Sequence, residues 1–314
     1  MSTAAVSEPV SADLPPPAVD ESALLELSDA DARARAAKMP YSVRFKLRDA
    51  ITPLQKAYLD IHGFLVFDRV LTTEEVPRLL EEIKQVEAKL LSSGTTSVFG
   101  VPVWVGEDPD GKPFMQRTGM FSVQSEWAHD LFTSSRFEAV RALIGEDARI
   151  GEREKDGVVV NRYVNAPGSL RPNLGWHTDA MRDLFYNWKV PGPMLNVGIH
   201  PDRVRPEDGG LRLLPGTHHD SFLMMTFRKP YFVAHKPDKN EVAVETWPGD
   251  LTVHDGRAWH RVQTSPHTGW KSLRHSLYIP YVRDAYAPKD ENSKPMWYLR
   301  VFDVYLSAKK KLRK

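Results

Sequence analysis

The sequence predicts a mainly β fold with flanking helices, built on a double-stranded β-helix, or jelly roll. Between residues 147 and 282, short β-rich runs alternate with turns that contain Gly, Pro and Asn, a pattern typical of an antiparallel sandwich or barrel. Before residue 147, longer stretches carry apolar residues at helical spacing. A jelly roll covers its sheet edges and leaves an open mouth in which a ligand can bind.

Composition limits the classes of function. The 314 residues are 41% hydrophobic with a net charge of +1, which is ordinary for a globular protein and gives no reason to expect a nucleic-acid partner. The absence of cysteine excludes disulfides and thiolate metal sites, so any metal must be held by His, Asp or Glu. We find no secretory signal and no run near the ~18 apolar residues of a membrane helix, and therefore expect a cytoplasmic protein without a membrane partner. The oligomeric state stays open.

The chain divides into a tail and one domain. Residues 1–40 are rich in Ala, Pro, Ser and Asp, which predicts a disordered tail with a short helix near Glu21–Ala37. Residues 41–314 form a single domain. Within it we expect a helical N-terminal layer over 41–146, the jelly-roll core over 147–282 and a C-terminal extension over 283–314 that ends in a basic run.

Local signals place the elements of the N-terminal layer. Thr52-Pro53 begins a helix that Gly63 ends, and a buried strand follows at Phe64–Phe67. Thr72 and Glu75 form a capping box at the start of the next helix. A third helix is predicted over Ser135–Ile144.

The core strands are recognised by their β-rich composition and by the turns between them. They are predicted at Val158–Val164, Leu174–Asp179, Leu195–His200, Leu211–Leu214, Val242–Thr246, Asp250–His254 and Leu273–Val282.

The sequence Gly175-Trp176-His177-Thr178-Asp179 carries the first candidate site. Side chains alternate along a strand, so His177 and Asp179 would share one face. One imidazole and one carboxylate are two-thirds of the facial triad that holds non-haem Fe(II) and leaves positions open. His260 is the candidate third ligand, and His254 is its rival.

Arg274 and Ser276 share a face of the last predicted strand. A guanidinium binds a carboxylate through two parallel hydrogen bonds, and a hydroxyl adds another. This strand could anchor an acidic cosubstrate whose other end reaches the metal, which is what 2-oxoglutarate requires.

These pieces, in this order, resemble the phytanoyl-CoA dioxygenase (PhyH-like) family of Fe(II)/2-oxoglutarate-dependent oxygenases. The similarity runs from about Leu54 to Tyr281. It is carried by the helix–Gly–strand order near residue 63, by Pro167-Gly168 ahead of the His-x-Asp motif, by the block Asp208–His218 (Asp-Gly-Gly-Leu-Arg-Leu-Leu-Pro-Gly-Thr-His), and by Gly249-Asp250, His260 and Arg274.

The resemblance implies a jelly roll with His177, Asp179 and His260 as iron ligands. It implies that Arg274, supported by Ser276, binds 2-oxoglutarate, and that dioxygen is the other cosubstrate. The expected reaction is hydroxylation of a C–H bond of a small molecule, in secondary metabolism. Because related halogenases have a small residue in place of Asp179, halogenation is not expected.

Four residues and one spacing depart from the family pattern or extend it. Thr178 stands where the family usually has Gln, and the fourteen residues from His260 to Arg274 exceed the usual spacing. Asn196 and His200 stand where acyl-CoA-oxidising members tend to have Trp and an acid, which argues against an acyl-CoA substrate. Asn161, on the strand before the ligand pair, is a further candidate for binding the cosubstrate.

Two alternatives remain open at this point. One is a cupin-like protein that keeps a metal but has no activity; the other is a metal-dependent hydrolase or isomerase on the same barrel, which needs no Arg274. Arginines near the expected cavity mouth are compatible with an anionic substrate; they are Arg117, Arg162, Arg171 and Arg182.

Overall fold

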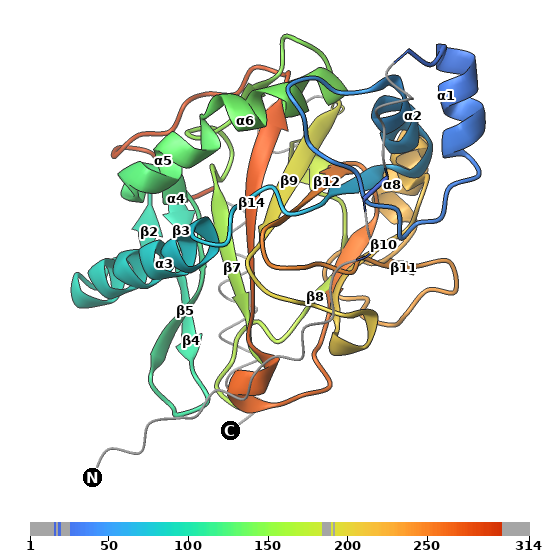
Figure 1. Ribbon diagram of the computed structural model, residues 1–314. Helices are drawn as coiled ribbons and strands as arrows, with labels where there is room; N and C mark the ends of the chain where they lie inside the picture. Colours follow the sequence, from blue (N-terminus) through green and yellow to red (C-terminus); the bar gives the residue numbers. More distant parts are fainter. Residues whose placement is uncertain (1–15, 17, 20–25, 184–189, 191, 297–314) are drawn as a thin grey trace.

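Within the described residues, two main β-sheets, a two-stranded sheet and a layer of helices make up the protein (Figure 1). The computed structural model describes residues 16, 18–19, 26–183, 190 and 192–296. The helices are α1 (Asp29–Ala36), α2 (Pro53–His62), α3 (Glu75–Ser92), α4 (Phe121–Gln124), α5 (Glu126–Phe132), α6 (Ser135–Glu138) and α8 (Phe222–Phe227). The short 3-10 helices are η2 (Ala139–Leu143), η3 (Ala180–Arg182), η4 (Pro206–Asp208), η5 (Thr217–His219) and η6 (Gly269–Ser272).

The strands follow one another along the chain from the N-terminal layer into the core. They are β1 (Phe64–Phe67), β2 (Ser97–Val98), β3 (Val101–Pro102), β4 (Trp104–Glu107), β5 (Pro113–Thr118), β6 (Arg149–Ile150), β7 (Val159–Tyr163), β8 (Leu174–His177), β9 (Met194–His200), β10 (Gly210–Leu213), β11 (Val242–Ala243), β12 (Asp250–Asp255), β13 (His260–Gln263) and β14 (Arg274–Val282).

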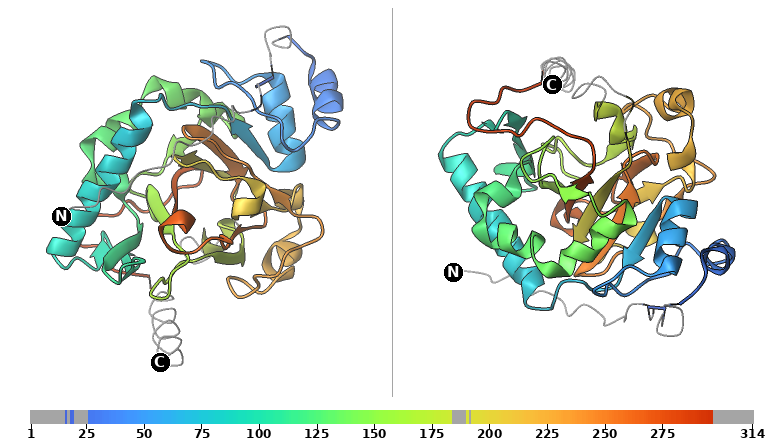
Figure 2. Two further views of the ribbon diagram at one scale, coloured as in Figure 1. Left: turned by 60° about the horizontal axis from the view of Figure 1, so that its bottom comes forward. Right: turned by 90° about the horizontal axis from the view of Figure 1, so that it is seen from above.

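The pairing of the strands confirms the predicted jelly roll. Within the described residues, the large sheet has the order β1-β12-β9-β14-β7-β5-β4, with β6 on β14, and the small sheet has the order β11-β10-β13-β8. All of these pairs are antiparallel. Figure 2 shows from two further directions that helices α3, α5 and α6 lie along one side of the large sheet.

Side chains that alternate along the strands of the large sheet face the hydrophobic core on one side and the small sheet on the other. Leu195, Val197 and Ile199 of β9 belong to the main hydrophobic cluster together with residues of α2, α3 and α5. Their neighbours in the strand, Asn196 and Gly198, therefore face the opposite side, toward the small sheet, because successive side chains point to opposite faces. The polar inner face of this sheet is where the site is built.

The predicted helix signals are present. Thr52 caps α2 through a complete capping box with Gln55, and Gly63 ends the helix at φ +80°, a conformation that glycine adopts at little cost. Thr72 and Glu75 exchange the two reciprocal hydrogen bonds of a capping box, at 2.8 and 3.2 Å.

Other predictions required correction. Segment 41–146 is more than a helical layer, because β1, β4 and β5 from it join the large sheet. The third helix begins as α6 but tightens into the 3-10 helix η2. The strand expected at Val242–Thr246 is only two residues long, and β13 was not predicted, because its four residues carry no long β-rich run.

Structure also begins earlier than residue 41. Helix α1 packs its fully buried Ala32 and Ala36 against the main cluster, so the short helix expected near Glu21–Ala37 is present and residues 26–40 are not a tail. The predicted boundary at residue 40 is therefore too late. Residues 1–15 and the basic run at 309–314 lie outside the described residues.

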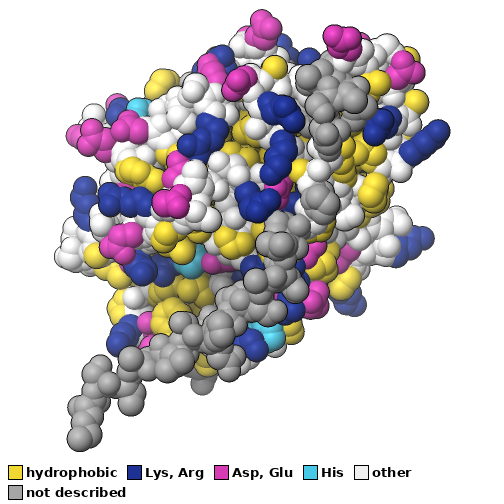
Figure 3. Space-filling view, viewed as in Figure 1, with side chains coloured by type: hydrophobic (Ala, Val, Ile, Leu, Met, Phe, Trp, Pro, Cys, Tyr) yellow, Lys and Arg dark blue, Asp and Glu magenta, His cyan; other side chains and the backbone are white. Residues whose placement is uncertain are grey.

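No helix in the described part of the chain has the length and apolar character needed to cross a bilayer. On the face seen in Figure 3, cationic and acidic side chains are interspersed, in keeping with the near-zero net charge.

A buried ionic cluster fastens the N-terminal segment to β12. Arg44 is 4% exposed and pairs with Asp250 and, at 3.1 Å, with Asp68. Asp250 also accepts hydrogen bonds from the backbone N–H groups of Arg69 and Trp247, at 3.0 and 2.7 Å.

We expect Arg44→Met to lower the free energy of unfolding by about 3–5 kcal/mol, because it leaves the buried carboxylate of Asp250 without a cation among the described residues and removes the buried partner of Asp68. Urea denaturation followed by circular dichroism measures this. Lys46→Met, which removes a half-exposed partner of Asp68, is the control and should cost at most about 1 kcal/mol; equal losses in the two variants would contradict the expectation.

Candidate metal centre and cosubstrate pocket

Two histidines meet across the small sheet. His177 ends β8 and His260 begins β13, and the two residues are direct cross-strand partners. Their ring centroids lie 4.1 Å apart, and both side chains are buried. The sheet register therefore brings together two imidazoles that are 83 positions apart in the sequence.

Backbone carbonyls fix the protonation pattern of both rings. The Nδ1 atom of His177 lies 2.9 Å from the carbonyl oxygen of Gly175, and that of His260 lies 3.1 Å from the carbonyl oxygen of Ala258. A carbonyl oxygen only accepts, so each Nδ1 must carry the hydrogen and donate. In the neutral ring each Nε2 then presents a lone pair, which is the form that binds a metal.

Asp179 reaches the two histidines from a turn. We expected it on a strand with His177, but β8 ends at His177 and Asp179 has helical angles, φ −77° and ψ −26°, just before η3. The expected reason for the convergence was wrong, and the convergence itself is present. Its carboxylate oxygens lie 3.7 Å from Nε2 of His177 and 3.3 Å from Nε2 of His260.

The three residues form a compact donor set. One ligand atom from each of His177, Asp179 and His260 lies within 4.8 Å of the others. Burial is the largest single influence and opposes ionisation of Asp179, but the charges and hydrogen bonds that His260, His254 and His177 can offer together outweigh it and hold the pKa of Asp179 well below its usual range. Two neutral imidazoles and one ionised carboxylate fit a divalent transition metal.

The rival histidine lies beside this set and outside it. His254 of β12 places its Nε2 3.8 Å from Asp179 Oδ2, and it does not belong to the three-residue donor group. It is 1% exposed, and neither of its ring nitrogens has a hydrogen-bond partner among the described residues.

The donor set opens onto a cavity of about 650 Å³ between the two sheets, within the range of small-molecule sites. One part of its lining belongs to the donor set and the inner face of the large sheet. Another part comes from segments that the sequence analysis did not assign to a site; it includes Trp104, Lys155, Asp156, Tyr231 and Phe232.

The segment that contains Phe232 and Ala234 covers the edge of the small sheet at β8. The backbone N–H of Trp176 donates to Ala234, and that of Phe232 donates back to Trp176, both at 2.9 Å. A Cβ on Gly175 would lie 2.4 Å from the carbonyl oxygen of Phe232, so only glycine permits this approach. The ring of Phe232 then packs 4.8 Å from that of His177.

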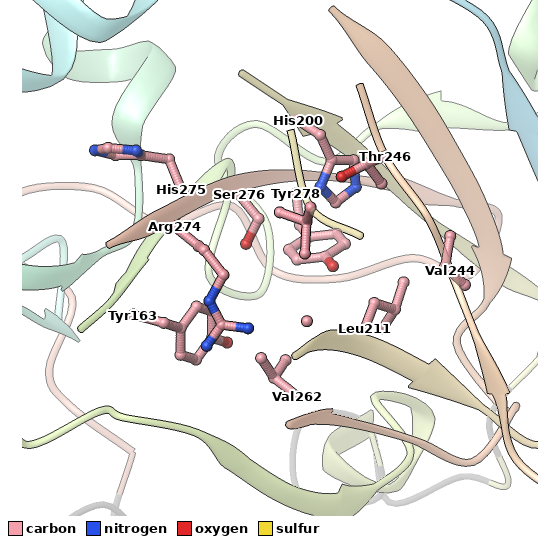
Figure 4. Close-up of a pocket in the computed structure, with 12 residues that line it drawn as sticks. Tyr163, His200, Leu211, Val244, Thr246, Val262, Arg274, His275, Ser276 and Tyr278 are labelled. Carbon is pink, nitrogen blue, oxygen red and sulfur yellow. The ribbon is translucent and has the colours of Figure 1, made fainter. Parts of the chain in front are cut away.

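Arg274 begins β14 and points into a small pocket that shares Tyr163, Val262 and Tyr278 with the large cavity. Figure 4 shows Arg274 and Ser276 directed into this pocket, with His275 turned away. Arg274 donates to the carbonyl oxygen of Gln263 at 3.0 Å, and its Nε has no hydrogen-bond partner in the described part of the chain.

The environment of Arg274 suits an anionic ligand. Among the described residues, no carboxylate oxygen lies within 4 Å of its guanidinium, although it is buried. Burial lowers the pKa of Arg274 to about 10, so the group remains charged at neutral pH. A buried, charged guanidinium without an acid is costly unless a ligand supplies one.

Glycine makes room for this arginine. Gly209 has φ +95°, and a Cβ there would lie 2.7 Å from Nη1 of Arg274 and 2.8 Å from the carbonyl oxygen of Gln263. The Gly209-Gly210 pair of the Asp208–His218 block therefore has a local purpose, since a larger residue would displace the arginine.

The remaining candidates lie on the same inner face. Asn161 of β7 is the cross-strand partner of Ser276 and lines the large cavity. His200 lines the small pocket and contacts Thr252 Oγ1 at 2.9 Å, and burial lowers the pKa of His200 to about 4. His200 is therefore neutral at physiological pH.

Comparison with known proteins gives one family. The family model for phytanoyl-CoA dioxygenase matches residues 59–268, about two-thirds of the chain, and the search of curated proteins returned no match.

Several solved structures have a similar fold. AviO1 from Streptomyces viridochromogenes Tue57 is 21% identical, with 74% of this chain and 95% of that chain covered and a TM-score of 0.51. EctD from S. alaskensis with 2-oxoglutarate and 5-hydroxyectoine is 19% identical, with 83% and 88% covered and a TM-score of 0.55. The epimerase SnoN in complex with Fe3+, alpha ketoglutarate and nogalamycin RO is 19% identical, with 76% and 85% covered and a TM-score of 0.51.

Proposed function

The chain belongs to the phytanoyl-CoA dioxygenase family, and on that basis we propose that it is an Fe(II)- and 2-oxoglutarate-dependent oxygenase that oxidises a C–H bond of a small molecule. We further propose that the reaction is a hydroxylation in secondary metabolism. The described part of residues 41–314, together with residues 26–40, would form its single catalytic domain.

One observation carries the proposal. Two histidines with fixed Nε2 lone pairs and one ionised carboxylate meet at a cavity, and a buried arginine faces an adjoining pocket. A metal site alone would not need that arginine. A keto-acid with a distal carboxylate needs both.

Each residue then has a role. His177, Asp179 and His260 would hold Fe(II), and three single-atom ligands would leave coordination positions for a cosubstrate and dioxygen. Arg274 would bind the distal carboxylate of 2-oxoglutarate through charge-assisted hydrogen bonds, with Ser276 and Asn161 as further donors. The bound iron, 2-oxoglutarate and dioxygen together would supply the oxidising power, with succinate and carbon dioxide as coproducts.

The similar structures support a role in biosynthesis. That the oxidation ends in hydroxylation is our own proposal. SnoN is described as an epimerase from nogalamycin biosynthesis, and EctD has been solved with 2-oxoglutarate and 5-hydroxyectoine. Hydroxylation is our choice because it needs the fewest special features: a C–H bond held beside the metal and no second reacting group.

The test is cosubstrate turnover. We expect the purified protein to form succinate from 2-oxoglutarate when Fe(II) and dioxygen are present, and to stop when either is removed. Metal binding without any 2-oxoglutarate turnover would favour the cupin-like, non-catalytic alternative. Metal-dependent activity that needs no 2-oxoglutarate would favour a hydrolase or isomerase.

A further inference from the structure

Asp179 is the member of the donor set that does not lie on a strand, so its direction depends on contacts from elsewhere. Strand β8 ends at His177, and Asp179 lies in the turn before η3. The backbone N–H of Ala180 donates to the carbonyl oxygen of Gly256, and the N–H of Gly256 donates to that of Met194 in β9, both at 2.9 Å. These bonds tie the turn to the large sheet.

Both oxygens of the Asp179 carboxylate are within reach of a metal in the donor set. Oδ1 lies 3.7 Å from Nε2 of His177, and Oδ2 lies 3.3 Å from Nε2 of His260. A carboxylate in this position could bind a metal through one oxygen or chelate it through both. Which of the two it does depends on its other contacts.

Two side chains from the inner face of the large sheet approach Oδ2. Asn196 of β9 donates to it from Nδ2, and Nε2 of His254 in β12 lies 3.8 Å from it. Asn196 and His254 are direct cross-strand partners, and both line the large cavity. The register of β9 and β12 therefore presents two polar side chains to one oxygen of a proposed metal ligand.

The contact between Asn196 and Asp179 has a fixed sense. An ionised carboxylate only accepts, so the amide must turn its Nδ2 toward Oδ2. Asn196 is buried, and a hydrogen bond to a charged group is strong where the surroundings are weakly polar. The bond therefore holds Oδ2 on the side of the large sheet.

His254 is placed to join this contact. It is almost fully buried, and neither of its ring nitrogens has a hydrogen-bond partner among the described residues, which is costly for a polar group. The 3.8 Å between Nε2 and Oδ2 is too long for a hydrogen bond, but a small rotation of the ring would close it. Oδ2 is thus an acceptor within reach of a hydrogen on Nε2.

We propose that Asn196 and His254 are positioning residues that together hold Oδ2 of Asp179, so that the carboxylate presents Oδ1 alone to the metal. The inference rests on the proposed function, because it assigns a purpose to the second oxygen of a proposed ligand. A carboxylate held at one oxygen cannot chelate, and this would leave a further coordination position open. Partners of this kind also orient a ligand and raise metal affinity.

The first test measures the affinity of the full chain for cobalt(II), without any cosubstrate. We expect Asn196→Leu and His254→Phe, which keep the approximate size of the side chains and remove the donors, each to weaken Co(II) binding by about 10–100-fold. The double variant should lose less than the product of the two effects, since both residues hold one oxygen. His254→Gln, which keeps a donor, should recover most of the affinity.

The second test asks directly how many oxygens bind. Infrared difference spectra between the metal-free and Co(II) forms isolate the carboxylate that changes on binding, and its two stretching bands lie further apart for one-oxygen binding than for chelation. We expect the wide separation in the wild type and in His254→Gln, and a narrower one in Asn196→Leu and in the double variant. A merely structural role would not move these bands.

Asn173→Leu is the matched control. Asn173 lines the same cavity, but its Nδ2 donates to Thr264 Oγ1 at 2.7 Å, so the Co(II) affinity and the band separation should stay at the wild-type values. Circular dichroism of the metal-free variants checks folding, and His254→Gln keeps the test valid if His254→Phe is unfolded.

Three results would overturn the inference: Asn196→Leu and His254→Phe with the Co(II) affinity of the wild type, a double variant equal to the product of the single effects, or a wild type whose bands show chelation. Succinate formation tests the oxygenase separately. A protein that shows the expected Co(II) results but forms no succinate would contradict the proposed function and still support the roles of Asn196 and His254.

Discussion

Replacing His260 with alanine is expected to reduce succinate formation to the protein-free background. His260 supplies one of the three proposed ligand atoms, its Nε2 lone pair is fixed by donation from Nδ1 to Ala258, and no other described histidine belongs to the donor group with His177 and Asp179. Metal affinity should fall by more than about a hundredfold, the upper range for residues that only support a ligand. Anaerobic Fe(II) titration and succinate formation measure the two effects.

His254→Phe is the comparison that gives this prediction its meaning. The two histidines are both buried and their ring centroids are 4.7 Å apart, so general damage to the site should affect them alike. We expect His254→Phe to retain measurable turnover at saturating metal, and His260→Ala to have none at any metal concentration. The reverse result would exchange their roles and would assign the third ligand to β12.

The sequence named the three residues that the structure brings together in the donor group, but it did not predict how they meet. The His-x-Asp spacing indicated a shared ligand pair, but period-two alternation was the wrong reason, since Asp179 leaves the strand and turns back through η3. Strand periodicity describes local direction only. Which of His254 and His260 completes the donor set depends on the β8–β13 register, which is a long-range property.

In the fold, too, local features were predicted from the sequence and long-range ones were not. Capping residues, stop signals and β-rich runs predicted α2, β1 and most core strands, because each of those signals acts within a few residues. The addition of β4 and β5 to the large sheet was missed, because it is set by packing against β7. The sequence placed Arg117 near the expected cavity mouth, but its pairing with Trp104 follows only from this sheet.

Arg274→Met is expected to raise the Michaelis constant for 2-oxoglutarate by at least roughly 30-fold, while Fe(II) affinity stays near the wild-type value. Truncating one partner of a buried, hydrogen-bonded charge pair costs about 2–5 kcal/mol, and about 1.4 kcal/mol corresponds to a factor of ten. Arg274 is buried, its Nε has no partner among the described residues, and no described carboxylate neutralises it, so a distal carboxylate would gain most of that energy.

Two further variants separate recognition of the cosubstrate from simple damage to the pocket. Arg274→Lys keeps a positive charge but loses the planar fork, so its Michaelis constant should lie between those of the wild type and Arg274→Met. Gly209→Ala keeps Arg274 itself unchanged but places a methyl group 2.7 Å from its Nη1, so the guanidinium must move. This variant should therefore also weaken 2-oxoglutarate binding without affecting the metal. If Arg274→Met had the wild-type Michaelis constant and full turnover, Arg274 would not be the residue that binds the distal carboxylate. The hydrolase or isomerase alternative, which does not need this arginine, would then explain the cavity better.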